Sequence, residues 1–192
     1  MKTLFTMVAA MLLVLPGVAQ KQYTTNKGFV SFFAKAPVAD VDAKNDKVNV
    51  ELNPSSDEVS FDMAMKDFEF KNGKMGRDAQ KKYLETEKYT KAGFKGKIQG
   101  KVDYDKPGSY PVTAKGKLKI HGVEKDVTEK GTVVVDGDGV KLQSQFNVTL
   151  ADYKIDTPKI LGQEMTADKV LVKIEAKLMK GAKEVASKKK DK

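Results

Sequence analysis

Apolar and polar residues alternate with a period of two along most of the chain from residue 47 to residue 178, and no other feature limits the fold as strongly. Successive side chains of a strand point to opposite faces, so this pattern predicts strands that each bury one face. It is clearest in residues 47–53, 58–65, 92–104, 109–120, 139–150 and 167–178. Turn sequences such as DKPGS (105–109) and DGDG (136–139) separate these segments. Long antiparallel hairpins of this kind predict either a meander that closes into a barrel or a sandwich.

One segment breaks the alternation. Residues 72–89, NGKMGRDAQKKYLETEKY, carry Met75, Ala79, Tyr83 and Leu84 at helical spacing and have no β-branched residue before Thr86. They predict one short helix of about three turns between strands. Pro158 and Gly162 predict a loop in residues 156–166, before the last strand.

The first 19 residues have the layout of a secretory signal peptide. Lys2 precedes an apolar run from Leu4 to Leu15, and Pro16 and small residues up to Ala19 follow it. The run is shorter than the roughly 20 apolar residues that span a bilayer. We therefore expect cleavage near Ala19 and a periplasmic or secreted protein, with one domain over residues 20–180. The absence of cysteine excludes disulfides and thiolate metal ligands.

The formal net charge of +9 is unevenly distributed. Lys2 leaves with the predicted signal peptide and Lys177–Lys192 carries +5, so about +3 remains on the body of the chain. A nucleic-acid-binding domain would show a basic stripe with arginines and stacking aromatics, whereas the only arginine here is Arg77. We expect no nucleic-acid partner, and a lysine-rich disordered tail at residues 181–192 that contacts the envelope membrane only weakly.

The residues that alternation predicts to face the interior are mostly large apolar side chains. Phenylalanine and methionine dominate them, and tryptophan is absent. A packed core is one interpretation. However, methionine fills irregular space, and an eight-stranded barrel is just wide enough to enclose one elongated apolar ligand. Ala114, Gly116 and Ser144 have the same inward phase and would leave room. The residues predicted to line the interior are Phe33, Phe61, Met63, Met65, Phe68, Phe70, Met75, Tyr83, Phe94, Ile98, Leu118, Ile120, Phe146 and Val148.

The single histidine, His121, precedes Gly122 in the middle of KGKLKIHGVEKDVTEKG (115–131). Alternation on both sides and the glycine predict a hairpin corner, where a histidine is usually exposed and replaceable. Glu124 and Asp126 follow on what reads as a solvent-facing strand. A catalytic role for this stretch is therefore disfavoured.

Acidic pairs elsewhere indicate turns. Asp103/Asp105 and Asp136/Asp138 lie beside glycine or proline, and DGDG offers too few oxygen ligands for calcium. The sequence predicts no catalytic residue, no metal site and no cofactor, hence a protein that is not an enzyme.

Four stretches carry a resemblance to the YceI-like family of exported bacterial proteins. Together they cover roughly residues 22–178, and their order and spacing are more specific than any one of them. They are KGFVSFFAKAPVADVDAKNDKV (27–48), FEFKNGKMGRDAQKKYLETEKYTKAGFKGKI (68–98), YPVTAKGKLKIHGVEKDVT (110–128) and FNVTLADYKIDTP (146–158).

The resemblance implies an all-β protein with one short helix, namely a lipocalin-like antiparallel barrel of eight strands with the helix near its open end. It also implies a non-catalytic protein whose interior cavity holds an isoprenoid or a similar amphiphilic chain. We therefore expect a long apolar ligand such as a polyisoprenoid, a quinone-like lipid or a fatty amide. Lys74, Arg77 and Lys81, in the predicted helix, are candidates for pairing with an anionic head group. The alternative is a filled barrel that acts as a structural or envelope-interaction protein without a ligand. Whether two copies form a homodimer is left open.

Overall fold

The computed structural model describes residues 22–35, 40–137, 139–156, 159–160, 163–164 and 168–181. The predicted signal peptide, and residues 182–192 of the predicted tail, lie outside the described residues. Within them, no helix is both long and apolar enough to span a bilayer.

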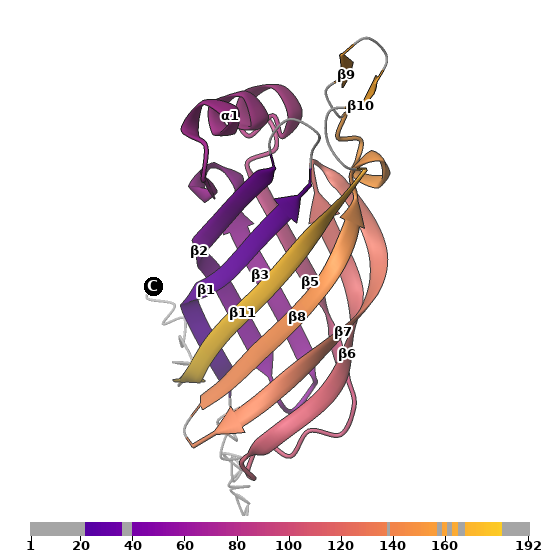
Figure 1. Cartoon of the computed structure of the whole chain (residues 1–192). Coiled ribbons are helices and arrows are strands. Elements are labelled where there is room, and N and C mark those ends of the chain that lie inside the picture. The colour runs from indigo at the N-terminus through magenta and orange to yellow at the C-terminus, as the bar shows by residue number, and fades with distance from the viewer. Residues whose placement is uncertain are drawn as a thin grey trace, which may run out of the picture.

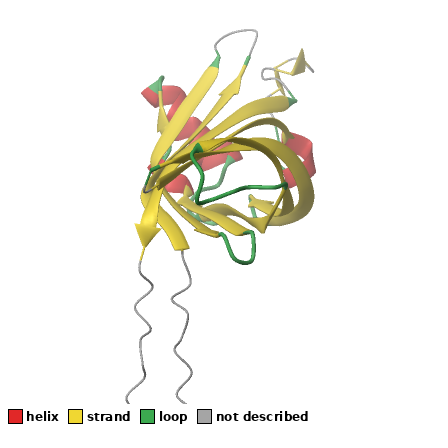
Figure 2. Ribbon diagram, turned by 90° about the horizontal axis from the view of Figure 1, so that it is seen from below, coloured by secondary structure: helices red, strands yellow, loops and turns green. Residues whose placement is uncertain are grey.

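Eight long antiparallel strands of the described chain close into a barrel (Figure 1), whose ring is seen end-on in Figure 2. Around the barrel the order is β1-β11-β8-β7-β6-β5-β3-β2, and β2 pairs with β1 to complete the ring. The predicted all-β barrel with one short helix is confirmed, and the sandwich is excluded. The strands are β1 (Gln22–Ala34), β2 (Val41–Asn53), β3 (Glu58–Ala64), β5 (Lys91–Gln99), β6 (Gly108–Ile120), β7 (Val123–Asp136), β8 (Gly139–Thr149) and β11 (Lys169–Gly181).

The helical segment lies at one end of the barrel, beside the top of β2 in Figure 1. It runs as α1 (Gly73–Asp78) and then as the wider π-helical turns of η2 (Ala79–Tyr83), which together form the short helical segment of about three turns that was predicted within residues 72–89. Asn72 caps its start, since the Asn72 side-chain oxygen accepts hydrogen bonds from the backbone N–H groups of Lys74 and Met75, both at 3.1 Å.

Shorter elements complete the same end of the molecule. They are the 3-10 turns η1 (Met65–Asp67) and η3 (Leu150–Tyr153), and the two-residue strands β4 (Glu69–Phe70), β9 (Lys159–Ile160) and β10 (Gln163–Glu164). Strands β9 and β10 pair with each other. The segment predicted to be a loop, residues 156–166, therefore contains a small hairpin.

Two strand predictions need correction. The predicted strand 92–104 ends at Gln99, because Gly100 adopts a φ of +144° that breaks the extended backbone. In β1, the pairing with β2 shifts register between Thr25 and Val30. Such an irregularity changes which side chains face inward, and here it turns Val30 and Phe32 inward and Phe33 outward, with Phe33 40% exposed.

One end of the barrel interior, called here the packed end, is filled by side chains that are almost fully buried. The aromatic rings of Tyr23 and Tyr104 stack there at 6.1 Å. Burial raises the pKa of Tyr104 to about 12, and its hydroxyl lacks a hydrogen-bond partner in the described part of the chain. The core residues of the packed end are Tyr23, Val50, Leu52, Val135, Val140 and Leu178, each at most 4% exposed.

The opposite end, the hollow end, is wider because the β7–β8 ladder is incomplete. These strands pair from Asp136↔Gly139 up to Gly131↔Ser144, and no pairing joins residues 123–130 to residues 145–149. β7 stays paired with β6 from Val123 to Val135, whereas β8 stays paired with β11. In Figure 1, β6 and β7 accordingly bow away from β8 towards the end that carries β9 and β10.

Candidate functional site

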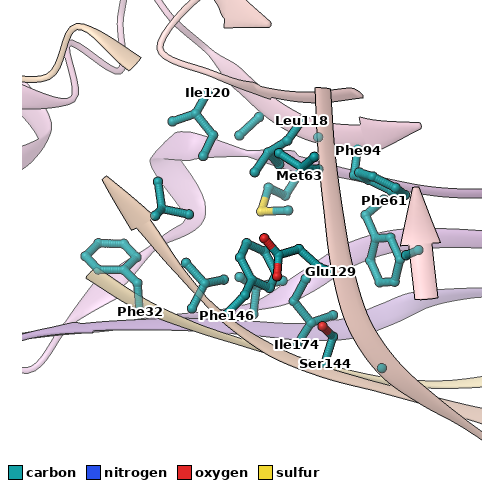
Figure 3. Close-up of a pocket in the computed structure, with 18 of the residues that line it drawn as sticks. Phe32, Phe61, Met63, Phe94, Leu118, Ile120, Glu129, Ser144, Phe146 and Ile174 are labelled. Atoms are coloured by element: carbon teal, nitrogen blue, oxygen red, sulfur yellow. The ribbon is translucent and has the colours of Figure 1, made fainter. Parts of the chain in front are cut away.

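A cavity occupies the hollow end of the barrel (Figure 3). The space between atoms in this region amounts to about 1310 Å³, which includes the part that is open to solvent. Every barrel strand except β2 contributes to its wall, and the roof comes from the segment between β3 and β5 through Met65, Phe68 and Leu84. Apart from glycines, the polar residues among the described part of the lining are Glu129, Thr132, Gln143 and Ser144.

The cavity wall contains most of the side chains predicted from strand alternation. Ten of the fourteen predicted lining residues border the cavity, so they surround a space and do not form a closed packed core. Ala114 and Ser144, two of the small residues expected to leave room, also lie in the wall. The ten are Phe61, Met63, Met65, Phe68, Phe94, Ile98, Leu118, Ile120, Phe146 and Val148.

Four predicted lining residues lie elsewhere. Phe33 faces outward for the reason given above. Phe70 packs beneath the helix, where a Cβ on Gly76 would come within 2.7 Å of the Phe70 Cβ. Met75 and Tyr83, on the helical segment itself, are partly buried but do not reach the cavity. The prediction selected these residues because they are large and apolar, whereas Phe70 and Tyr83 pack against the buried core beside the helical segment.

Sequence reasoning missed other lining residues, including Phe32, Leu84, Val172 and Ile174. Val172 and Ile174 stand in phase with the alternation of the last strand and could have been found. Phe32 could not, because the β1 register shift is invisible in the sequence. The Phe32 ring packs against those of Phe68 and Phe70, at centroid distances of 5.1 and 5.7 Å, and so links the wall to the roof.

The candidate head-group residues Lys74, Arg77 and Lys81 are exposed and do not border the cavity. They lie on the outward side of the helical segment, whereas Gln80 of the same segment donates a hydrogen bond to the Phe68 backbone carbonyl at 3.0 Å. Their pairing with a head group stays a prediction, and it requires a ligand that emerges from the barrel.

His121 forms the hairpin corner that was predicted, but the expected exposure is wrong. His121 and Gly122 have φ angles of +51° and +75°, the two positive values of a tight two-residue hairpin turn between β6 and β7. The His121 side chain is only 7% exposed. Its ring packs on that of Tyr89 at a centroid distance of 4.1 Å.

Both ring nitrogens of His121 have partners from distant segments. Nδ1 lies 3.1 Å from the Tyr153 carbonyl oxygen, to which it donates, and Nε2 lies 3.0 Å from Glu85 Oε2. An ion pair between Lys125 Nζ and Asp152 Oδ1 at 3.0 Å joins the same two regions. These contacts tie the β6–β7 turn to η3 and to the segment after the helix, and so bridge the opening left by the incomplete β7–β8 ladder. His121 therefore has a clear structural role at the mouth of the cavity.

Glu129 is the polar feature of the wall that sequence reasoning overlooked. It lies on β7 opposite Ala114 of β6. Burial raises the pKa of the Glu129 carboxyl. The signal was present, since Glu129 is in phase with Val127, Val133 and Val135, which are inward residues of the same strand. Within the described residues, no group of three or more histidine, aspartate or glutamate side chains lies close enough to hold a metal ion.

The family model described as the YceI-like domain matches residues 22–178. No curated protein matches the chain in sequence.

Several solved structures share the fold at low sequence identity. A polyisoprenoid binding domain from Saccharophagus degradans, implicated in plant cell wall breakdown, is similar with a TM-score of 0.69 and 13% identity over 84% of this chain and 99% of that one. BcnA from Burkholderia cenocepacia has a TM-score of 0.63 and 20% identity, over 79% of this chain and 96% of its own. The YceI protein of Campylobacter jejuni has a TM-score of 0.54 and 17% identity, over 94% and 99%.

Proposed function

The chain belongs to the YceI-like family, and from this premise we propose that it is an exported, non-catalytic protein that holds a long apolar or amphiphilic lipid inside its barrel. The observation that carries the proposal is the cavity, with its almost wholly apolar wall at the hollow end. The polyisoprenoid-binding domain with the same fold supports the ligand class. Within this class, a polyisoprenoid, a quinone-like lipid and a fatty amide are the ligands we propose.

The mechanism is burial of a chain in a space that the protein keeps open. Each methylene removed from water contributes about 0.8 kcal/mol, or about fourfold in affinity. On β6 the lining runs from Val112 to Ile120, so at about 3.4 Å per residue and a strand tilt of about 40° the cavity is roughly 20 Å long. A chain of a dozen or more carbons can therefore be held without polar contacts.

The packed end supports one-sided entry. Leu52 and Leu178 are fully buried there, and the Tyr23 and Tyr104 rings stack across the interior. A ligand consequently enters from the hollow end, past the roof formed by Phe68 and Leu84.

Export is part of the proposal and is supported by the signal-peptide layout of residues 1–19. The lysine-rich tail would add a weak attraction to an anionic membrane surface, from which a lipid could be taken up or delivered. Residues 1–21 and 182–192 lie outside the described residues.

The test is to isolate the protein from the periplasm or medium, extract bound lipid and identify it by mass spectrometry. We expect an N-terminus at Gln20, a co-purified long-chain lipid and displacement of a hydrophobic naphthylamine dye by added isoprenoids. Ala114→Phe, which fills the cavity from its wall, should weaken dye binding at least tenfold.

Lys115→Phe is the matched control, since Lys115 neighbours Ala114 but is exposed on the outer face. It should leave dye binding unchanged. Absence of bound lipid together with failure of isoprenoids to displace the dye would refute lipid binding. Recovery of the protein in the cytoplasm with residues 1–19 attached would refute export.

A further inference from the structure

Glu129 is the one ionisable side chain in the cavity wall among the described residues. Figure 3 shows its carboxyl group pointing inward among labelled apolar side chains, with Met63 and Phe146 in the same view. The fold does not require an acid at this position, because the neighbouring inward residues of β7 are Val127, Gly131 and Val133. An ionisable carboxyl group in an otherwise apolar cavity wall is therefore not explained by packing and suggests a role in ligand binding.

The Glu129 carboxyl has no hydrogen bond or ion pair to any other described residue. Of the other polar lining residues, Ser144 has its hydroxyl donating to the Lys130 carbonyl oxygen at 2.8 Å, so that hydroxyl proton is already used. Burial raises the Glu129 pKa because removal from water disfavours the charged carboxylate. A carboxyl group that is partly removed from water without a partner destabilises the empty protein, and a bound molecule could supply that partner.

We propose that Glu129 accepts a hydrogen bond from a donor group of the ligand, namely a hydroxyl, an amide N–H or an ammonium, held deep in the barrel. The inference rests on the proposed lipid-binding function and specifies its ligand class. An ionised carboxylate is an acceptor only, and it repels phosphates and carboxylates. Glu129 thereby selects long-chain alcohols, amides and amines over anionic lipids of equal length.

The position of Glu129 fixes which end of the ligand is recognised. Its β6 partner Ala114 lies six residues from Ile120, the last residue of β6 at the hollow end, which places it about 16 Å down the barrel axis. The exposed cations Lys74, Arg77 and Lys81 belong to the helical segment at the opposite end of the cavity. The donor-bearing end of the ligand therefore points towards the packed end.

The test uses one chain length with different end groups. Hexadecanol, hexadecanamide, hexadecylamine, hexadecanoate, hexadecyl phosphate and methyl hexadecanoate compete with the naphthylamine dye at pH 7 for wild type, Glu129→Gln, Glu129→Leu and Glu124→Gln. Glu124 is an exposed residue of the same strand, so Glu124→Gln is the matched control. Circular dichroism and thermal melting of each variant establish that it is folded.

Wild type and Glu124→Gln should bind the alcohol, amide and amine about ten- to a hundredfold more tightly than the methyl ester, and the two anions least. Glu129→Leu should abolish this ranking while keeping or improving methyl ester binding. Glu129→Gln removes the negative charge, so it should no longer bind the two anions more weakly than the methyl ester.

Equal binding of all six compounds by wild type, or an unchanged ranking in Glu129→Leu, would overturn the role of Glu129 and leave lipid binding intact. If no compound displaces the dye from wild type, the proposed function and this inference both fail. The variant Glu129→Gln keeps nearly the same shape, so the test does not depend on Glu129→Leu folding.

Discussion

The two ends of the barrel interior are built from the same eight strands and the same alternation, yet one is solid and the other is empty. At the packed end, Val50, Leu52 and Leu178 are at most 1% exposed. At the hollow end, Phe94 and Phe146 are only partly buried because they face the cavity. The difference shows that inward phase alone does not decide whether a side chain forms core or lines a site.

Strand pairing explains much of the difference. At the packed end the β7–β8 ladder continues to Asp136↔Gly139, and β-branched and leucine side chains fill the narrow interior. At the hollow end that ladder has stopped, and larger aromatic side chains surround a wider space. Removing a side chain should therefore have different effects at the two ends.

The largest expected contrast is between Leu178→Ala and Phe146→Ala. Leu178→Ala opens a void in close packing and should lower the free energy of unfolding by about 2–5 kcal/mol. Phe146→Ala enlarges a space that already exists. Without ligand, this variant should therefore lower the free energy of unfolding by only about 1–2 kcal/mol. Urea denaturation monitored by circular dichroism measures both. Equal losses in the two variants would mean that the hollow end is also packed in solution.

The turns at the two ends of β7 give the next contrast. The turn at the hollow end leaves less room for an added side chain than the turn at the packed end. Gly122 and Gly137 both have positive φ, +75° and +56°, where a side chain adds about 1–2 kcal/mol of strain. A Cβ on Gly122 would also lie 2.6 Å from Tyr89 Cε1, whereas a Cβ on Gly137 would meet nothing within 4 Å.

We therefore expect Gly122→Ala to lower the free energy of unfolding by about 2–3 kcal/mol and Gly137→Ala by about 1 kcal/mol. At about 2–4 °C per kcal/mol for a domain of this size, differential scanning calorimetry separates the two melting temperatures. If both variants melt at the same temperature, the contact between Gly122 and Tyr89 is not maintained in solution.

The smallest contrast is between an inward and an outward glutamate. Burial raises the Glu129 pKa, whereas hydrogen bonds from Lys173 and Lys141 to Glu175 lower the Glu175 pKa. The lysine Nζ atoms lie 2.8 and 3.3 Å from the Glu175 carboxylate oxygens. Because the Glu129 pKa is raised in the folded protein, its contribution to stability falls as pH rises above the ordinary pKa of 4.5. Because the Glu175 pKa is lowered, its contribution to stability is lost as pH falls below 4.5.

At pH 7 without ligand, Glu129→Gln should thus be more stable than wild type and Glu175→Gln less stable. Both differences should vanish well below pH 4.5, where the wild-type carboxyls are protonated. Melting temperatures of wild type and both variants, measured from pH 7 to well below pH 4.5, test this prediction. Differences of the same sign in the two variants would contradict the assigned environments.

Local pattern was sufficient for most of the architecture. Alternation identified β2, β3, β6, β8 and β11 with their inward faces, and the family resemblance supplied closure into a barrel. The helical segment was found from the spacing of Met75, Ala79 and Tyr83, although its π-helical second half was not. These features depend on residues near one another in the chain.

The errors concern features that depend on distant residues. His121 looked replaceable because its partners Glu85 and Tyr153 are 36 and 32 residues away. Phe33 was assigned to the wall because the register shift in β1 is set by its partner strands. The emptiness of the hollow end could not be predicted, since it follows from where the β7–β8 ladder stops.

The pairing of β1 with β11 has a consequence for how the chain matures. Tyr23 pairs with Lys180, so the first and last described strands close the ring together. Until residues 169–181 have been synthesised, the nascent sheet ends in two open edges, β1 and β8, which can pair with other chains. The barrel therefore completes its folding only after its last strand has been made, and a chain that stops short of residue 169 is left prone to aggregation.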